Sequence, residues 1–312
     1  MFVITQLIGL YVLNANPFEI TQVVNGTLTN VTNPSLSWIQ PPEIQDQSEF
    51  SSYFGSLLIS FIIAIIILFL LTKFKIGVIL KGWFFLVVAI ALFISLNAIF
   101  ISSPLGRFVG SLYFIIPALI IVLGLSFIKL FGHNFIVHNL TELFIYPGIA
   151  TVFVPILNIW FVLILLVLIS IYDMWAVWHS GIMQKMAKYQ INKLKIFSGF
   201  FIPYISKKLK MQMKNSKDKK KKVNVNLAIL GGGDVVFPII TSGVIFKTGI
   251  VNLPFGLPAF VGGFWPAIFV IAGATLGLTL LFSFSEKKKF YPAMPFITGG
   301  IFLGIILSYL LI

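Results

Sequence analysis

The sequence contains no cysteine, and charged residues make up only 10% of its 312 residues. The absence of cysteine excludes disulfides, thiol catalysis, iron–sulfur clusters and zinc sites built on cysteine. The scarcity of charge, against about 25% in soluble domains, together with a hydrophobic content of 58%, excludes a water-soluble globule. At about 20 residues per membrane helix, the chain has room for a helix bundle but not for a separate soluble catalytic domain.

Long apolar runs predict an all-α polytopic membrane protein. Eight such runs are residues 52–72, 83–101, 109–129, 139–155, 157–178, 226–247, 257–282 and 291–311. Residues 1–14 form a ninth apolar segment, which is short for a span at about 1.5 Å per residue and is also compatible with a signal peptide. Because no basic residue precedes this run and no small-residue cleavage site follows it, we expect about nine transmembrane helices.

The basic residues are distributed unevenly between the predicted loops. If the N-terminus is inside, 20 of the 22 Lys and Arg residues lie on the inner side, and only Arg107 and Lys247 lie outside. This bias predicts an inner N-terminus and an outer C-terminus, so we interpret the net charge of +13 as topological and expect no nucleic-acid partner. The predicted regions are helices one to six at 1–178 with an outer loop at about 15–51, a basic inner loop at 179–225, and helices seven to nine at 226–312.

Two aspartates, Asp173 and Asp234, lie within apolar spans, where an ionised side chain costs at least about 2.5–3.5 kcal/mol. Neither has a basic residue at comparable depth, and both are predicted at a similar depth from the inner side. If they face one another, the two carboxyls share a proton and provide an acid beside a base. The same positions also suit buried helix-to-helix hydrogen bonds, or a proton or cation pathway in a transporter.

Two motifs contain these aspartates, and a third opens the last span. They are Ile171-Tyr172-Asp173, Gly231-Gly232-Gly233-Asp234 and Pro292-Ala293-Met294-Pro295. In order and spacing they resemble the YD, GxGD and PALP motifs of the presenilin and signal peptide peptidase family of intramembrane aspartyl proteases, on its sixth, seventh and ninth helices. The resemblance spans roughly residues 52–312, and the small size of the chain is similar to that of archaeal members. Prepilin peptidases share the GxGD motif, so a prepilin-type peptidase is an alternative.

The resemblance implies catalytic roles for Asp173 and Asp234, with Gly231 and Gly233 shaping the approach to the second carboxyl. Glycines permit close approach of backbone and substrate, although close helix packing also explains them. Pro238, four residues after Asp234, cannot donate a hydrogen bond to its carbonyl, which is expected to loosen the helix beside the site.

The remaining motif residues are expected to help to place the aspartates and the substrate. By resemblance, residues Pro292, Ala293, Met294 and Pro295 line the active site, although proline is also favoured at a helix start. Met294 replaces the leucine of the family, a nearly volume-conserving change. Tyr172 is a candidate to orient the neighbouring carboxylate, or packs against other helices.

Residues 223–227 alternate between apolar and polar side chains and predict a short strand before Asp234. Such a strand could hold an unwound substrate by backbone pairing, as presenilin-like enzymes are thought to do. Gly273 and Gly277, like Gly300 and Gly304, are spaced for close helix packing.

The predicted activity is that of an intramembrane aspartyl endopeptidase, which hydrolyses peptide bonds in or near transmembrane segments with water activated between two aspartates. Its expected partners are transmembrane helical substrates and membrane lipids, and it requires no metal or organic cofactor. A proton-coupled transporter or cation pathway that uses the same aspartates is the main alternative. The pattern leaves the oligomeric state open.

Overall fold

The computed structural model describes residues 1–24, 27–42, 44, 47–74, 76–103, 111–132, 134–180, 198–204, 226–251, 259–284 and 291–312. In this part of the chain there are nine α-helices, which agrees with the number predicted. The helices are α1 (Phe2–Ala15), α2 (Gln47–Lys73), α3 (Gly77–Ser102), α5 (Ser111–Phe131), α6 (Phe135–Phe153), α7 (Ile159–Trp175), α10 (Gly232–Lys247), α11 (Phe264–Phe284) and α12 (Met294–Leu311).

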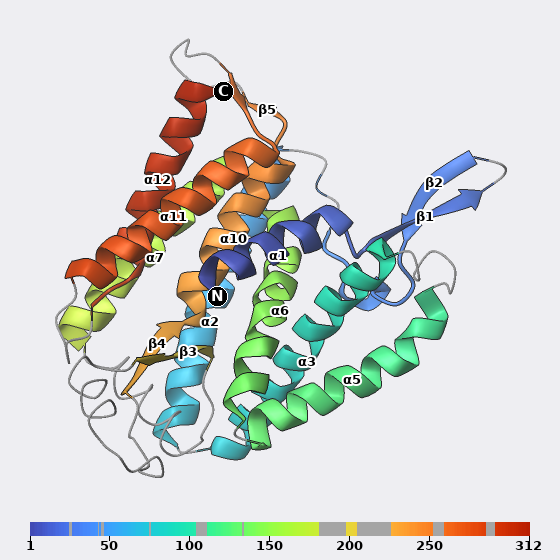
Figure 1. The fold of residues 1–312 in the computed structure, drawn as a ribbon, viewed down its shortest axis with the longest axis horizontal. Coiled ribbons are helices and arrows are strands. Elements are labelled where there is room, and N and C mark those ends of the chain that lie inside the picture. The colour runs from blue at the N-terminus through green and yellow to red at the C-terminus, as the bar shows by residue number, and fades with distance from the viewer. Residues whose placement is uncertain are drawn as a thin grey trace, which may run out of the picture.

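Three antiparallel strand pairs accompany the helices. The pairs are β1 (Glu19–Val24) with β2 (Thr27–Thr32), β3 (Gly199–Tyr204) with β4 (Asn226–Gly231), and β5 (Ile250–Val251) with β6 (Phe260–Val261). Figure 1 shows β3 and β4 at one end of the helix bundle, while β5 lies near the C-terminus at the other end. Most of the predicted inner loop, 179–225, lies outside the described residues.

The helices are apolar enough to lie in a membrane. Six of the described helical stretches are long enough to cross one, namely Glu49–Leu71, Gly77–Ser102, Phe135–Ile156, Ile159–Trp178, Phe264–Phe284 and Met294–Leu311. Two shorter apolar stretches, Phe2–Ala15 and Ile115–Phe131, accompany them. The protein is therefore an integral membrane protein that crosses the bilayer several times.

The start of the predicted seventh span is corrected by the structure. Residues Asn226–Gly231 form strand β4, and helix α10 begins only at Gly232. The run from Leu227 to Leu230 is apolar, and a short apolar run does not distinguish a buried strand from a helix. Of the strand predicted at 223–227, residues 226 and 227 lie in β4, and 223–225 lie outside the described part.

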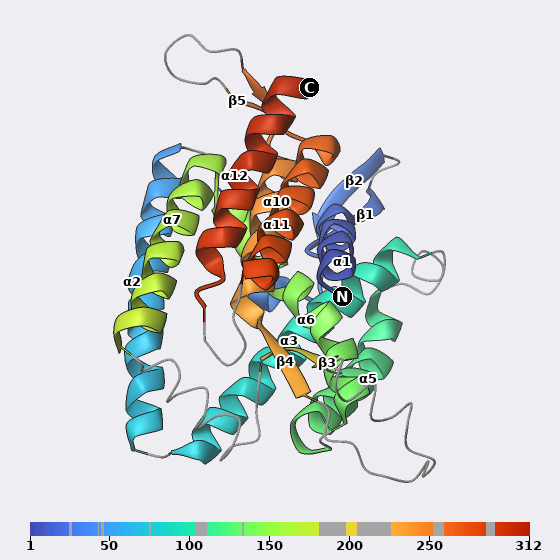
Figure 2. The same ribbon diagram turned by 60° about the vertical axis from the view of Figure 1, so that its left-hand side comes forward.

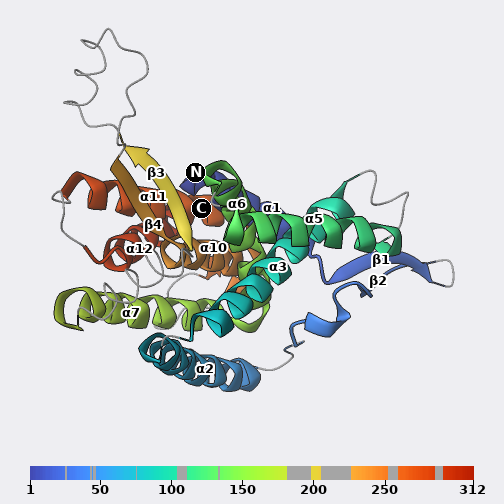
Figure 3. The same ribbon diagram turned by 90° about the horizontal axis from the view of Figure 1, so that it is seen from below.

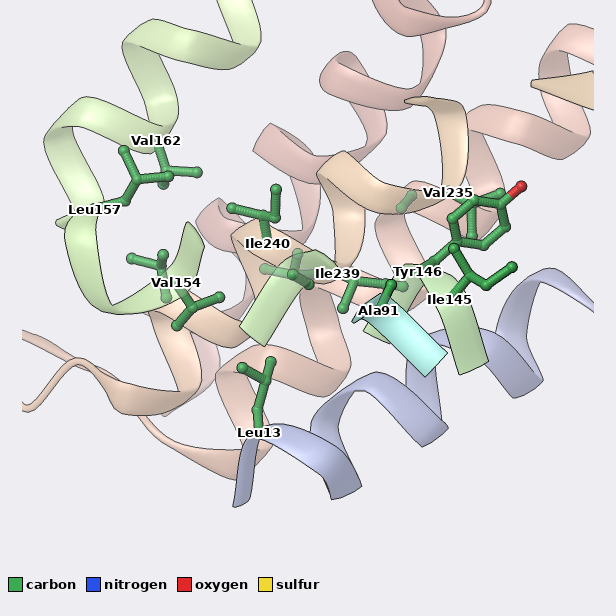
Figure 4. Packing of buried hydrophobic residues seen from close by; sticks show 14 of the residues in the cluster. Leu13, Ala91, Ile145, Tyr146, Val154, Leu157, Val162, Val235, Ile239 and Ile240 are labelled. Atoms are coloured by element: carbon green, nitrogen blue, oxygen red, sulfur yellow. The ribbon is translucent and has the colours of Figure 1, made fainter. Parts of the chain in front are cut away.

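Helix α1 is short, and it lies across one face of the bundle, where it packs against α6 and α10 (Figure 1). Gly9 lies against Ile239 of α10 so closely that a Cβ atom would come within 2.5 Å of the Ile239 Cγ2. The buried Gln6 side chain also donates a hydrogen bond of 3.0 Å to the Val235 carbonyl oxygen. Figure 4 shows Leu13 and Ile239 in the same apolar core. Helix α1 thus supports the helix that carries Asp234.

Helices α11 and α12 are in close backbone contact, as the paired glycines predicted. A Cβ atom at Gly273 would collide with the backbone of Gly300, and one at Gly304 would lie 2.9 Å from the Phe269 carbonyl carbon. Helix α12 also packs against α7, and the two are adjacent in Figure 2. The predicted packing role of these glycines is therefore confirmed.

Two elements lie at the periphery of the bundle. Helix α2 leaves most of its apolar surface exposed and lies outside α7 in Figure 3. The β1–β2 hairpin projects away from the bundle on another side (Figures 1 and 3). The core that holds the motif helices is therefore compactly packed on one side of α7 and loosely covered by α2 on the other.

Candidate active site

Asp234 lies at the start of α10, as the third residue of the helix. The N–H of Gly231, the residue that caps this helix, donates a hydrogen bond to the Asp234 carboxylate. Such a backward bond from the third residue is half of a capping box, and a helix N-terminus favours a negative charge. Because β4 is a strand, Asp234 lies at the helix start and not about two turns inside it, as a helix from residue 226 would place it.

Asp173 lies in the last turn of α7 and is only 8% exposed. Its Oδ2 atom accepts a hydrogen bond of 3.1 Å from the backbone N–H of Met294, and the backbone N–H of Ala293 also donates to the carboxylate. Ala293 caps α12 and Met294 is its first residue. The Asp173 carboxyl therefore occupies the N-terminus of a neighbouring helix, where backbone N–H groups have no partners within the helix.

The structure brings the two carboxyl groups together. Helix α7 packs against both α10 and α12, and the carboxyls of Asp173 and Asp234 are close enough to interact electrostatically. In the described part of the chain, neither aspartate forms an ion pair with a basic side chain. Two neighbouring carboxyls without a cation favour a single shared proton, which leaves one group as an acid and the other as a base.

The residues Pro292 to Pro295 form the turn that leads into α12 beside Asp173. Pro292 and Met294 are buried, and Pro295 occupies the second position of the helix, where a missing N–H costs nothing. Ser170 lies one turn before Asp173 in α7, and Thr298 lies one turn after Met294 in α12. Their hydroxyls form a buried hydrogen bond of 2.8 Å. This bond joins α7 to α12 next to the hydrogen bonds from Ala293 and Met294 to the Asp173 carboxylate.

The three glycines before Asp234 have different surroundings. A Cβ atom at Gly231 would lie 3.1 Å from the Asp234 Oδ2, whereas one at Gly233 would meet only the Phe237 ring at 3.7 Å. The tightest position is Gly232, where a Cβ would lie 2.8 Å from the Ser198 Oγ and 3.1 Å from the Tyr146 ring. Gly232 was not singled out from the sequence, although the run of three glycines was a visible signal.

Tyr172 packs between α7 and α2. Its ring is 37% exposed and packs edge-on against Phe61 of α2, with ring centroids 6.2 Å apart. Among the described residues, no hydrogen bond joins Tyr172 to Asp173. Its environment therefore favours packing between α7 and α2 over orientation of the carboxylate.

An apolar cavity of about 670 Å³ opens beside the start of α10. It lies between α2, α6, α7 and α10 and reaches Gly232 and Gly233 at the start of α10. Its other walls include Phe61 of α2, Tyr146 of α6 and Leu165 of α7. A cavity between loosely and tightly packed helices is suited to an apolar ligand that arrives from the lipid.

A buried polar cluster near the site was missed by the sequence reasoning. Lys129 and Glu142 form an ion pair of 2.6 Å in which each side chain is 1% exposed. From the sequence, Lys129 is only one of the 20 basic residues counted on the inner side, at the end of the run 109–129, and Glu142 lies in the run 139–155 without a predicted role. The available signal was the spacing of His138, Asn139 and Glu142, which places three polar side chains on one side of an apolar helix.

Comparisons with known proteins identify the class of protein that this fold and carboxyl pair define. The family model described as signal-peptide peptidase, presenilin aspartyl protease matches residues 31–312. The chain therefore belongs to the presenilin and signal peptide peptidase family, and it is an intramembrane aspartic endopeptidase. A comparison with curated proteins found no match.

Solved structures agree with this fold. The chain resembles a presenilin family intramembrane aspartate protease in two crystal forms. For the C222 form the TM-score is 0.52 at 17% identity, over 98% of this chain and 93% of the other. For the P2 form the TM-score is 0.53 at 16% identity, over 99% and 97%. The predicted presenilin-like fold with about nine helices is confirmed.

Proposed function

We propose that Asp173 and Asp234 are the catalytic pair of this protease. The observation that carries the proposal is that two carboxyls from different helices lie within electrostatic reach of each other, both held by backbone N–H groups and neither paired with a described cation. A purely structural pair would cost desolvation without a compensating charge, so this arrangement is more readily explained by chemistry. By contrast, Glu142 of α6, which is also buried, is paired with Lys129.

In the proposed reaction, the ionised carboxyl takes a proton from water while the water oxygen attacks the carbonyl carbon of the substrate. The protonated carboxyl donates its proton to the carbonyl oxygen, which gives a neutral tetrahedral intermediate. This intermediate collapses when the C–N bond breaks and a proton passes to the leaving nitrogen. The products are one carboxylic acid and one amine, and the chemistry requires no metal or organic cofactor.

The substrate in this proposal is a transmembrane helix that enters from the lipid. The apolar cavity between α2, α6, α7 and α10 provides a path that reaches Gly232 and Gly233 beside Asp234. Helix α2 forms one wall and makes few contacts with the rest of the bundle, so it can move aside at low cost. The exposed apolar surfaces of the helices also account for membrane lipids as partners.

Strand β4 offers a place for the unwound part of the substrate. In the antiparallel register, Gly199 lies opposite Gly231 and Phe201 lies opposite Ile229. Gly199 and Phe201 direct their backbone N–H and C=O groups toward α6, so the same groups of Ile229 point away from β3. We expect an extended substrate segment to pair with this outer side of β4, next to Asp234.

The distribution of basic residues supports one orientation of the protein in the membrane. With 20 of the 22 basic residues on one side, we propose that the N-terminus lies inside and the C-terminus outside. The β3–β4 sheet and the carboxyl ends of α2 and α7 then face the inner side.

The proposal is tested by cleavage of a single-span helical reporter by purified protein in detergent, with native protein, Asp173→Asn and Asp234→Asn. We expect both variants to lose at least about a thousandfold in kcat, because each change removes an acid or a base that no other group replaces. Retained melting temperatures would exclude unfolding as the cause. Equal product from all three proteins would refute the assignment, and an ion flux abolished by both changes would then favour a transport pathway.

A further inference from the structure

The backbone of strand β3 is held by polar side chains of α6 at two successive positions. Asn139 forms two bonds with Phe201, donating to its carbonyl oxygen at 2.9 Å and accepting from its N–H at 3.0 Å. At Gly199, the N–H donates to the Glu142 Oε1 at 3.2 Å, and the carbonyl oxygen is 2.9 Å from the His138 Nε2. In Figure 3, β3 lies between α6 and β4.

These side chains form the hydrogen bonds that a third strand beside β3 would form. Residues two apart on a strand point their backbone groups to the same edge, and here both pairs of groups on the outer edge of β3 are occupied by side chains. Pro203, the next residue in this series, has no N–H to offer at all. The edge of β3 is therefore closed to another strand, whereas the edge of β4 is not blocked by α6.

We call the side chains of Lys129, His138, Asn139 and Glu142, which together hold β3, the clamp. Burial of its two charged groups costs desolvation free energy. Glu142 is fully buried, and its charge is balanced by the buried Lys129 from α5 at 2.6 Å. A buried ion pair is often no more stabilising than apolar side chains of similar size, so stability alone does not explain its presence. Its distinctive feature is that the same Oε1 atom that accepts the Lys129 bond also accepts the Gly199 N–H.

The clamp is connected to the catalytic carboxyl through a short path of backbone. Gly199 lies opposite Gly231 in the sheet, and the N–H of Gly232 donates to the Ser198 carbonyl oxygen at 3.3 Å. Gly231 in turn donates to the Asp234 carboxylate. Any displacement of residues 198 and 199 is therefore passed directly to the start of α10.

We propose that Glu142, neutralised by Lys129 and assisted by His138 and Asn139, is a positioning residue that fixes β3 and thereby the register of β4 and the place of Asp234 relative to the scissile bond. This inference rests on the proposed catalytic role of Asp234. None of the four side chains lines the substrate cavity, and the lining residues that the clamp reaches through the backbone, Ser198 and Gly232, lie at its end beside Asp234. The expected effect is therefore on kcat and on the choice of bond, and not on KM.

The test compares two neutral replacements of the ion pair, because removal of one charge alone would leave the other buried without a partner. In Lys129→Met with Glu142→Gln, the amide oxygen still accepts from Gly199. In Lys129→Met with Glu142→Leu, this acceptor is absent at nearly equal volume. We expect the first double variant to cut the single-span reporter within about twofold of the native kcat, and the second to show about a tenfold lower kcat with an unchanged KM.

The position of the cut is the readout that a purely structural role would not change. Mass spectrometry of the products should show additional cuts at neighbouring bonds for the Glu142→Leu double variant and a native pattern for the Glu142→Gln one. Equal kcat and identical products from both would overturn the proposal, and so would equal losses in both. Asp234→Asn in the same assay distinguishes failure of this positioning proposal from failure of the proposed catalytic role. Cleavage by Asp234→Asn would refute the catalytic role of Asp234.

A second pair of variants decides the matter if the Leu double variant does not fold. Asn139→Leu removes both bonds to Phe201 without a change of charge, and Thr141→Val is its control. Thr141 is equally buried on the same helix, but its hydroxyl bonds only to the His138 carbonyl oxygen within α6. Extra cuts by Asn139→Leu and not by Thr141→Val support the clamp, whereas a native pattern from both contradicts it.

Discussion

Asp173 and Asp234 both lie at the N-terminus of a helix, but they reach this position in different ways. Asp234 belongs to the helix whose start it occupies, and its N–H partner, Gly231, is three residues away in the chain. Asp173 ends its own helix and accepts its bonds from Ala293 and Met294, which are more than a hundred residues distant. One carboxyl is therefore placed by local sequence and the other by the packing of α7 against α12.

The difference predicts which substitutions disturb which carboxyl. Changes at the glycines before α10 act at once on Asp234, through a few bonds of backbone. Changes further along α12 act on Asp173 from a distance, and their effect is diluted because α11 and α12 can relax around a new side chain. Three predictions, from the largest effect to the smallest, can separate the local from the tertiary placement.

The largest effect is expected from Gly232→Val on the local side. The new side chain would collide with Ser198 and Tyr146, which would push the start of α10 and Asp234 away from Asp173. A displacement of this kind costs about a hundredfold in rate, so we expect a fall of this size in kcat for the reporter. Gly82→Val, at a position in α3 with nothing within 4 Å, is the matched control. Similar kcat values for both variants would show that Asp234 is not placed by this close approach.

A smaller effect is expected from Gly300→Leu on the tertiary side. This side chain would be driven into the backbone of Gly273 and would displace α12, and with it the N–H groups that bind Asp173. Overpacking costs about 1–3 kcal/mol, and we expect about a tenfold fall in kcat together with a lower melting temperature. Gly299→Leu lies on the same helix with nothing within 4 Å and should behave like the native protein. Indistinguishable melting temperatures for the two would contradict the packing account.

The smallest effect is expected from loss of the hydrogen bond between Ser170 and Thr298. Ser170→Ala or Thr298→Val removes about 1 kcal/mol, which corresponds to a fall in kcat of about fivefold if the bond orients Asp173. A double-mutant cycle checks this, because the double variant should be no slower than the slower single one. Thr275→Val, which removes a bond only within α11, provides the control. Fully additive losses would mean that the two hydroxyls act separately.

The features that depend on local sequence, such as the places of the helices, could be predicted well. The apolar runs gave the approximate places of the helices, since a membrane span needs a long apolar segment whatever surrounds it. The motifs pointed to the turn before α12, and the structure does place Ala293 and Met294 against Asp173. The catalytic role of the aspartates and the orientation of the termini stay predictions.

The parts that were wrong or missed depend on contacts between distant segments. A strand was predicted only up to residue 227, and the rest of β4 was assigned to a helix, because its partner, β3, lies in a region whose composition indicates only a basic loop. Lys129 and Glu142 lie on different helices, and the sequence gives no sign that they meet. The packing of the Tyr172 ring likewise depends on the position of α2, and its role beside the carboxylate stays a prediction. Such pairings are properties of the fold and not of any single segment.

Binding of a transition-state analogue shows whether both carboxyls act on one reacting centre. Two apolar peptides would be compared, identical except that one carries a hydroxyl on a tetrahedral carbon in place of the scissile carbonyl. We expect native protein to bind the hydroxyl peptide at least about a hundredfold more tightly than its deoxy partner, and Asp173→Asn and Asp234→Asn each to abolish this advantage. An advantage that persists in either variant would contradict the claim that the two aspartates form one catalytic pair.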